Sequence, residues 1–163
     1  MLAGVLAPAT VQDAAVVVRL RDAAAEWLLA RGIEQWRPGE LTEARIAMRA
    51  EAGELYVCRM DGAVAAAVVV ADQDSAVWGP VAGDAGYVHT LVIDRRHAGQ
   101  GLGRRVLAGV EHLIATRHAR ARLDCVSTNN RLRKYYRDAG YREVGERDLG
   151  AGWSPVTLFE KRL

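Results

Sequence analysis

Apolar residues recur along this chain with two different periods, which predict helices alternating with strands. Helical spacing marks four stretches, at residues 11–31, 40–52, 101–118 and 129–139. Short apolar runs rich in β-branched residues predict seven strands, at residues 2–7, 55–60, 63–70, 88–93, 122–126, 141–148 and 156–163. The dipeptide Asp61-Gly62 predicts a tight hairpin between the second and third of these strands. Residues 72–86 are predicted to be a loop.

The order of these elements predicts the fold class. A right-handed crossover through the helix at 101–118 makes the strand at 122–126 parallel to the strand at 88–93. No repeat, low-complexity segment or linker interrupts the pattern. We therefore expect residues 1–163 to form a single α/β domain, which is large enough to bury its own core.

The most informative stretch runs from Val88 to Leu107, where a strand is followed by three alternating glycines and the start of a helix. The first N–H groups of a helix lack partners within the helix, and the helix dipole adds a positive potential there. Glycines let such a backbone close around a phosphate without Cβ clashes. Gly99, Gly101 and Gly103 therefore predict a site for a phosphorylated ligand.

Two common phosphate-binding patterns do not fit this stretch. The dinucleotide fingerprint G-x-G-x-x-G requires a glycine where Arg104 stands, and no G-K-[ST] tripeptide occurs in the chain. The plainer alternative is a glycine-rich turn between a strand and a helix that binds no ligand.

The net charge of +2 hides an uneven distribution. Residues 1–94 hold 7 Lys and Arg against 13 Asp and Glu, whereas residues 95–147 hold 13 against 5. The basic residues form no run of five and have few aromatic neighbours, so a small, multiply charged anion fits them better than a nucleic acid. The acidic half then suits an amine substrate.

The sequence also indicates a cellular compartment. The first residues carry no basic segment typical of a signal peptide, and the apolar run at residues 63–71 is shorter than the roughly 20 residues that span a bilayer. Cys58 and Cys125 fit no metal-binding spacing and are expected to be reduced thiols. We expect a cytoplasmic protein without a bound metal.

Two stretches resemble signatures of the GNAT superfamily of N-acetyltransferases. The stretch from Ala98 to Gly103 resembles the acetyl-CoA loop R/Q-x-x-G-x-G/A, with Ala98 in place of the leading Arg or Gln. The second signature, N-x₆-Y-x₃-G-[FY], is filled by Asn129, Tyr136, Gly140 and Tyr141. The resemblance covers nearly the whole chain. It implies a GNAT-type fold with a mixed, mostly antiparallel sheet of six to seven strands and about four helices, whose parallel strands splay apart at the acetyl-CoA site.

The resemblance also implies which residues bind acetyl-CoA. The pantetheine arm pairs with the backbone of the central strand, which here is Leu91, Val92 and Ile93. The pyrophosphate is expected on the loop that follows, made of Gly99, Gln100, Gly101, Leu102, Gly103 and Arg104. Asn129 either holds the pantetheine amide or caps its own helix. The basic residues beyond it, Arg131, Arg133 and Lys134, are candidates for the 3′-phosphate.

For the chemistry, the resemblance implies direct attack of a primary amine on acetyl-CoA in a ternary complex. A backbone N–H of Leu91 or Val92 would stabilise the oxyanion, and Tyr136 would protonate the departing thiolate. His89 stands two positions before Leu91, so strict strand alternation places both on one face. His89 is therefore the first candidate for the base or a proton relay, and a histidine packed inside the sheet is the alternative.

The acceptor is expected to be a small-molecule or peptide amine. Glu34 and Trp36, between the first two predicted helices, are expected to line its pocket. The alternative function is a non-catalytic GNAT-fold module that binds acyl-CoA as a sensor or partner domain. Tyr136 favours the enzyme, because a binding module has no need of an acid for the thiolate. Nucleic acids and membranes are not expected partners, and the family resemblance implies a homodimer through the last strands.

Overall fold

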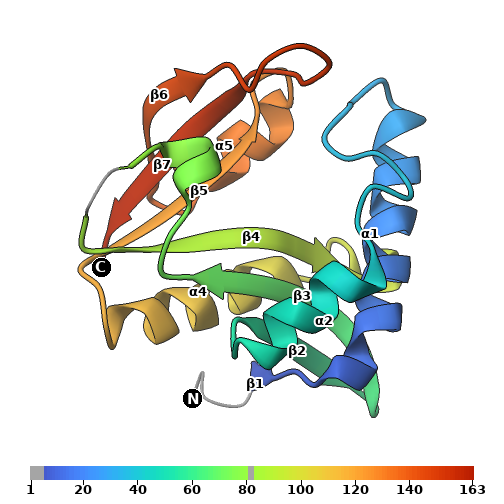
Figure 1. The fold of residues 1–163 in the computed structure, drawn as a ribbon. Coiled ribbons are helices and arrows are strands. Elements are labelled where there is room, and N and C mark those ends of the chain that lie inside the picture. The colour runs from blue at the N-terminus through green and yellow to red at the C-terminus, as the bar shows by residue number, and fades with distance from the viewer. Residues whose placement is uncertain (1–5, 81–82) are drawn as a thin grey trace.

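One seven-stranded sheet organises the protein, and its strands lie in the order β1-β2-β3-β4-β5-β7-β6 (Figure 1). The computed structural model describes residues 6–80 and 83–163. Every neighbouring pair of strands is antiparallel except β4 and β5, which are parallel. The strands are β1 (Ala7–Pro8), β2 (Leu55–Met60), β3 (Ala63–Ala71), β4 (Ala85–Ile93), β5 (Arg120–Val126), β6 (Arg142–Arg147) and β7 (Val156–Arg162). The predicted mixed sheet is confirmed, although the strand expected at 2–7 is only β1, and residues 2–5 lie outside the described part.

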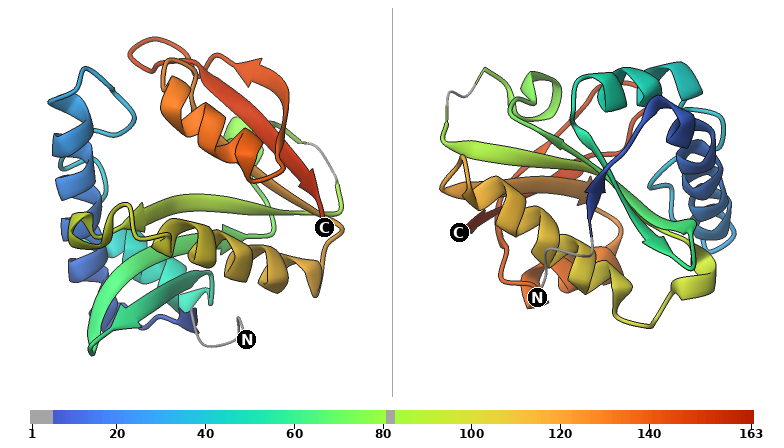
Figure 2. Two further views of the ribbon diagram at one scale, coloured as in Figure 1. Left: turned by 180° about the vertical axis from the view of Figure 1, so that it is seen from behind. Right: turned by 90° about the horizontal axis from the view of Figure 1, so that it is seen from below.

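Helices cover both faces of this sheet. They are α1 (Ala14–Leu29), α2 (Glu43–Glu51), α3 (Ser75–Trp78), α4 (Leu102–Ala115) and α5 (Asn130–Asp138), with 3₁₀ turns η1 (Val11–Asp13) and η2 (Arg95–His97). The left view of Figure 2 shows α4 and α5 on the near face, whereas α2 lies on the face that Figure 1 presents. The four predicted helices are present, and α3 is an additional short helix within the predicted loop at 72–86. Among the helices of residues 6–80 and 83–163, none has the length and apolar character needed to cross a bilayer.

Local sequence signals explain several element boundaries. The Asp13 carboxylate accepts the Thr10 backbone N–H at 2.9 Å, so the first helical segment begins with the 3₁₀ turn η1 before α1. Asp61 and Gly62 both have positive φ, at 51° and 80°, as a two-residue hairpin of the mirror-image type requires. The predicted hairpin between β2 and β3 is therefore confirmed.

Each face of the sheet packs its own hydrophobic core. Between the sheet and α4 and α5, the buried side chains include Val106, Ile114 and Phe159. Between the sheet and α1 and α2, they include Val17 and Ile46. β3 contributes alternate residues to both cores, because its pattern is apolar throughout and it is buried on both sides.

The parallel strands pair over only three residues before they separate. Ala85–Tyr87 of β4 pairs with 120–122 of β5, and no further residues of these two strands are in register. Figure 1 shows the two strands starting side by side and diverging toward their carboxyl ends. Arg122 stabilises the end at which β4 and β5 are paired, since its guanidinium donates to the Tyr87 hydroxyl at 3.0 Å and to Glu160 at 2.9 Å. The splayed parallel strands implied by the family resemblance are therefore present.

Candidate functional site

A cleft of about 560 Å³ opens where β4 and β5 diverge. Its walls come from β4, the glycine loop and the start of α4, α5, and the connection between α1 and α2. Most of the residues predicted from the sequence line it: Trp36, His89, Leu91, Ile93, Gly99, Gly101, Leu102, Gly103, Arg104 and Tyr136. The topology thus brings together residues that are up to 100 positions apart in the sequence, from Trp36 to Tyr136.

The glycine loop forms an open cradle at the start of α4. Gly99 and Gly101 both have φ of +76°, in the left-handed region that favours glycine, and a Cβ on either would meet no atom within 4 Å. Gly101 is the N-cap of α4 and makes no side-chain cap bond. The first N–H groups of this 14-residue helix therefore face the loop without intrahelical partners. This arrangement fits an anionic group such as a pyrophosphate.

An ion pair fixes the turn that leads into this loop. The Asp94 carboxylate accepts the Arg96 backbone N–H at 2.9 Å and the Arg96 guanidinium at 2.6 Å. The bond to Arg96 holds the pKa of the Asp94 carboxyl below its usual value. Gln100, predicted to touch the pyrophosphate, is exposed, and its amide donates to the Arg96 carbonyl at 3.2 Å. Its side chain therefore supports the loop from outside the cleft.

A β-bulge interrupts β4 within the site. Ala67 pairs with Val92 and Val69 pairs with His89, so three steps along β4 match two steps along β3. Thr90 sits at this irregularity with φ of 51°, which is rare for a β-branched residue. The extra residue breaks the strict alternation of side chains between the two faces of β4, on which the prediction of a shared face for His89 and Leu91 depends.

The bulge changes which side chains share a face. His89 and Val92 lie opposite residues of one face of β3, and Val92 is buried in the core beneath α1 and α2. Leu91 instead packs against the core beneath α4. The prediction that His89 and Leu91 share a strand face is therefore wrong, because the bulge shifts the alternation by one residue.

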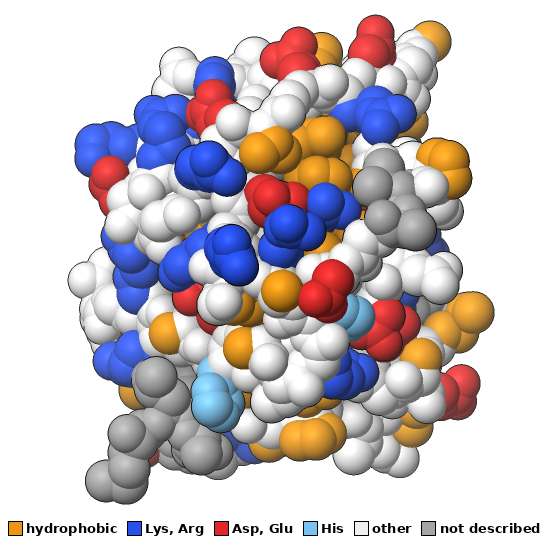
Figure 3. Space-filling model, turned by 90° about the vertical axis from the view of Figure 1, so that its left-hand side faces the viewer, with side chains coloured by type: hydrophobic (Ala, Val, Ile, Leu, Met, Phe, Trp, Pro, Cys, Tyr) orange, Lys and Arg blue, Asp and Glu red, His pale blue; other side chains and the backbone are white. Residues whose placement is uncertain are grey.

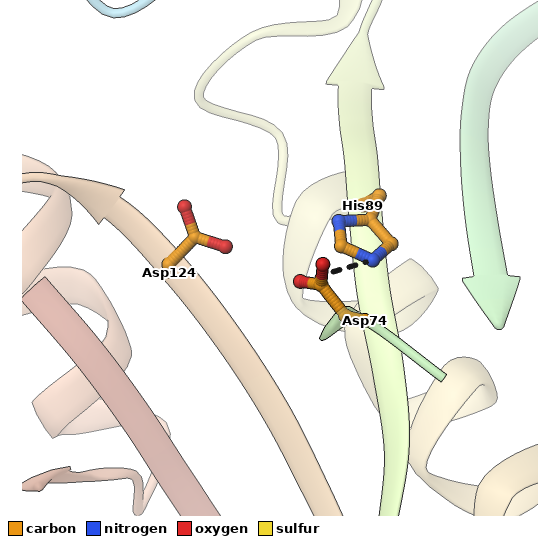
Figure 4. Close-up of side chains that lie close together, drawn as sticks. All are labelled: Asp74, His89 and Asp124. Carbon is orange, nitrogen blue, oxygen red and sulfur yellow. Dashed lines mark ion pairs between the residues drawn. The ribbon is translucent and has the colours of Figure 1, made fainter. Parts of the chain in front are cut away.

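His89 belongs to a compact cluster with two aspartates. Its Nε2 atom lies 3.5 Å from Oδ2 of Asp74, and Asp124 reaches toward this pair from the opposite splayed strand (Figure 4). One ligand-type atom from each of the three residues lies within 4.8 Å of the other two. Asp74 also caps α3, because its Oδ1 accepts the Val77 N–H at 3.2 Å, whereas its buried Oδ2 has no hydrogen-bond partner. The cluster can pass protons or hold a metal ion.

Burial shifts two pKa values within this cluster. Burial lowers the pKa of His89 from its ordinary value, although the Asp74 carboxylate opposes the shift. Burial raises the pKa of Asp124 to about 7, and the nearby Asp74 adds to the rise. Near neutral pH the site therefore contains a neutral imidazole beside a carboxyl group that is easily protonated.

Tyr136 lies in the cleft wall and is also part of the core. Its ring contacts Phe159 and Tyr141 at centroid distances of 5.5 and 6.0 Å. Burial raises its pKa above the usual value, so the phenol keeps its proton at neutral pH. A protonated hydroxyl in the cleft is what a proton donor requires.

Asn129 acts as a helix cap. Its side-chain oxygen accepts the Leu132 N–H at 3.1 Å and so caps α5, which is one of the two roles left open by the sequence, and its contact with the pantetheine amide stays a prediction. Its amide nitrogen lies 3.5 Å from the Gln35 side-chain oxygen, which also accepts the Val126 N–H at 3.2 Å. Gln35 thereby ties the connection between α1 and α2 to the end of β5.

A second cavity of about 260 Å³ adjoins the cleft. Glu34 and Trp36 both line it, and only Trp36 also lines the main cleft; their role in binding the amine stays a prediction. Glu34 is exposed and pairs with Arg37 at 3.1 Å. Arg37 in turn donates to the Gly152 carbonyl, so two distant connections meet over this cavity.

Most of the basic residues between 95 and 147 are paired with acids. Figure 3 shows Lys and Arg side chains lying beside Asp and Glu on one side of the molecule. Among the 3′-phosphate candidates, Arg133 pairs with Glu143 at 3.0 Å and Lys134 pairs with Asp138 at 2.6 Å. The basic residues of this segment that line the cleft are Arg95, Arg104 and Arg131.

The polar residues of the site that the sequence did not predict include Arg21, Gln35, Asp74 and Asp124. Asp124 carried a usable signal, since it is a charged residue between the buried apolar residues Leu123 and Cys125 of β5. Arg21 carried a similar one, because it lies four residues after the buried Val17 of α1 and so falls on the same face of the helix. Gln35 and Asp74 lie outside regular periodic segments, and no pattern in the sequence marks them.

Comparisons with known proteins show to which family this chain is similar. The family model described as the acetyltransferase (GNAT) family matches residues 21–141. YesJ, an uncharacterized N-acetyltransferase of Bacillus subtilis (strain 168), is 36% identical over 166 residues, which cover 96% of this chain and 88% of YesJ.

Solved structures share the fold. A GNAT-family acetyltransferase of Listeria monocytogenes 4b F2365 is 26% identical and superposes with a TM-score of 0.79, over 97% of this chain and 94% of its own. The Salmonella typhimurium protein yncA, solved with its cofactor acetyl-CoA, is 16% identical with a TM-score of 0.72, over 96% of this chain and 92% of its own.

Proposed function

Because this chain belongs to the GNAT family of acetyltransferases, we propose that it transfers an acetyl group from acetyl-CoA to a primary amine by direct attack in a ternary complex. Residues 1–163 act as one catalytic domain in this proposal. The observation that carries it is the open glycine cradle at the start of α4, which faces the cleft between the splayed strands.

The residues present fit acetyl-CoA. The space above Gly99 and Gly101 is free of other atoms, so a pyrophosphate can approach the backbone N–H groups at the start of α4. Arg104 and Arg131 line the same cleft and supply positive charge. Beyond Tyr87 the edge of β4 is not paired with β5, which leaves backbone groups of Leu91 to Ile93 for the pantetheine arm. Ala98 leaves this recognition to the backbone, because it has no polar side chain.

When bound, acetyl-CoA supplies an acetyl thioester whose carbon–sulfur bond breaks as the amine nitrogen bonds to the carbonyl carbon. The backbone N–H of Leu91 donates a hydrogen bond to the carbonyl oxygen, on which negative charge develops. His89, kept neutral by burial, accepts the proton that the amine releases. Tyr136, kept protonated by burial, gives its proton to the departing sulfur. Solvent restores both groups to their starting protonation states.

Acetyl-CoA binding is tested by calorimetry with the variant Gly101→Asp. An aspartate there directs a carboxylate into open space where the pyrophosphate is expected, and acetyl-CoA binding should be lost. Gly53→Asp is the matched control, because Gly53 has a similar φ of +72°, is equally open and lies outside the cleft. Unchanged acetyl-CoA affinity of Gly101→Asp would show that the glycine loop is not part of the acetyl-CoA site.

The reaction itself is tested with the wild-type protein and a panel of primary amines, by following the release of free CoA. Release that depends on the amine supports the acetyltransferase. Acetyl-CoA binding without release on any amine would leave a non-catalytic binding module. The same assay after dialysis against a chelator should give unchanged rates, because the proposed steps use His89 and Tyr136 for proton transfer and need no metal ion.

A further inference from the structure

Two cavities meet at four residues, none of which belongs to the glycine cradle. Arg21, Gln35, Trp36 and Asp124 line both the main cleft and the smaller cavity of about 260 Å³. A molecule at this junction would lie beside Asp124 of the splayed strand β5 and leave the glycine cradle free for acetyl-CoA. The junction is therefore the natural place for the acceptor of the proposed reaction.

Arg21 brings a buried guanidinium with unused hydrogen-bond donors to this junction. Its side chain is only 9% exposed, and its Nε and Nη1 atoms are buried without a hydrogen-bond partner. Nη2 lies 3.4 Å from Glu40, and the guanidinium carbon lies 4.5 Å from the centre of the Trp36 ring. The ion pair with Glu40 engages Nη2 and the aromatic face offers no acceptor oxygen, so the Nε and Nη1 donors of the guanidinium stay unused. Buried donors of this kind are costly unless a partner satisfies them.

Asp124 brings the opposite charge to the same place. Within residues 6–80 and 83–163 its carboxylate forms no salt bridge, and its charged neighbour in the cluster is another carboxylate, Asp74. Burial raises the pKa of Asp124 to about 7, which reflects this lack of a cation. An ammonium group placed beside Asp124 would supply the positive charge that pairs with its carboxylate.

The small cavity has an apolar part beside the charged residues Glu34, Arg37 and Glu40. This apolar part comes from two connections, from α3 and from the strands β5 and β7: Trp36, Val77, Val126, Leu149, Trp153 and Val156. Such a surface suits an aliphatic or aromatic side chain.

We propose that the acceptor is a free amino acid with an apolar side chain, whose carboxylate binds Arg21 and whose ammonium group lies against Asp124. This proposal rests on the proposed acetyltransferase function and specifies its substrate class. An acceptor with both charges satisfies the free donors of Arg21 and the carboxyl of Asp124, whereas a simple amine leaves Nε and Nη1 of Arg21 without an acceptor. A peptide or protein N-terminus lacks the adjacent carboxylate.

The decisive assay compares three matched acceptors on the wild-type protein: leucine, leucinamide and isopentylamine. They share the side chain and the amine, and differ in the carboxylate. Loss of a charge-assisted pair predicts that kcat/KM falls about 10- to 100-fold from leucine to either of the others. Equal kcat/KM for all three overturns the proposal while leaving the acetyltransferase standing. If no amine releases CoA, the acetyltransferase itself fails.

Two variants separate recognition by Arg21 from a structural role. Arg21→Gln should lower kcat/KM for leucine, mainly through KM, and leave leucinamide nearly unchanged. Glu40→Gln removes the negative charge that pairs with Nη2 of Arg21 and should preserve the preference for leucine. Acetyl-CoA affinity and the melting temperature report whether each variant is folded. A merely structural Arg21 would lower the activity on leucine and leucinamide equally, and that result would overturn the proposal.

Discussion

The burial of the Asp124 carboxyl leads to a prediction about the stability of the protein, and this prediction can be tested without a substrate. Its pKa rises from 3.8 to about 7 in the folded protein because burial disfavours the charged form. The folded state therefore holds a proton that the unfolded chain has released, and stability falls as the pH rises from about 4 to about 7. Three pKa units correspond to about 4 kcal/mol, which sets the upper limit of this loss.

Asp124→Asn removes this pH-dependent cost while keeping the size and polarity of the side chain. Near pH 4 the variant and the wild type should differ little, because asparagine resembles the protonated acid. The variant should then gain stability relative to the wild type as the pH rises, reaching about 2–4 kcal/mol near pH 8. Urea unfolding of both proteins at several pH values between these limits measures the difference.

A matched control tests whether the effect belongs to the buried site. Asp138 is exposed and pairs with Lys134, whose bond holds the pKa of Asp138 below its ordinary value. The difference between Asp138→Asn and the wild type should therefore stay constant over the same pH range. If the Asp124→Asn difference also stays constant, the carboxyl is not buried in the way described, and its assignment to the ammonium group loses its physical basis.

Three further variants probe the chemistry and the packing. Tyr136→Phe should lower kcat roughly 10- to 1,000-fold with little change in KM for acetyl-CoA, and an unaltered kcat would make Tyr136 a packing residue. Because burial lowers the pKa of His89, the rise of kcat/KM with pH should occur below the ordinary histidine pKa. His89→Gln should remove this rise while the melting temperature stays nearly constant, and a preserved rise would exclude His89 as the proton acceptor. Gly86→Ala places a Cβ 2.8 Å from two carbons of Ile114 and should lower the free energy of unfolding by about 1–3 kcal/mol in urea, whereas unchanged stability would show that the helix can move away.

Patterns of apolar residues were sufficient to predict the sheet, the hairpin and the crossover. Each of these depends on short-range periodicity or on turn residues such as Asp61 and Gly62. Both kinds of signal involve only residues that are close together in the sequence. The glycine cradle was predictable for the same reason, since one continuous stretch forms it. The short helix α3 was missed because four residues within a loop establish no period.

The acceptor side of the site was less predictable because distant segments build it. Arg21, Asp74 and Asp124 come from three elements, and only the folded topology brings them near His89. The face of His89 was predicted wrongly because a bulge at Thr90 is invisible to a rule that assumes a period of two. The role of Asn129 as a cap depended on the position of one N–H group, which the sequence alone left open.

The bulge at Thr90 also limits how this chain can change in length during evolution. His89 and Val92 face the same core only because one extra residue separates them. Deleting a single residue between them would restore strict alternation and turn one half of the strand away from its core. Loops at the edge of the sheet face no such restriction, since an inserted residue there changes no facing pattern. Relatives that keep this site should therefore vary in length at their loops, and keep the spacing from His89 to Val92 fixed.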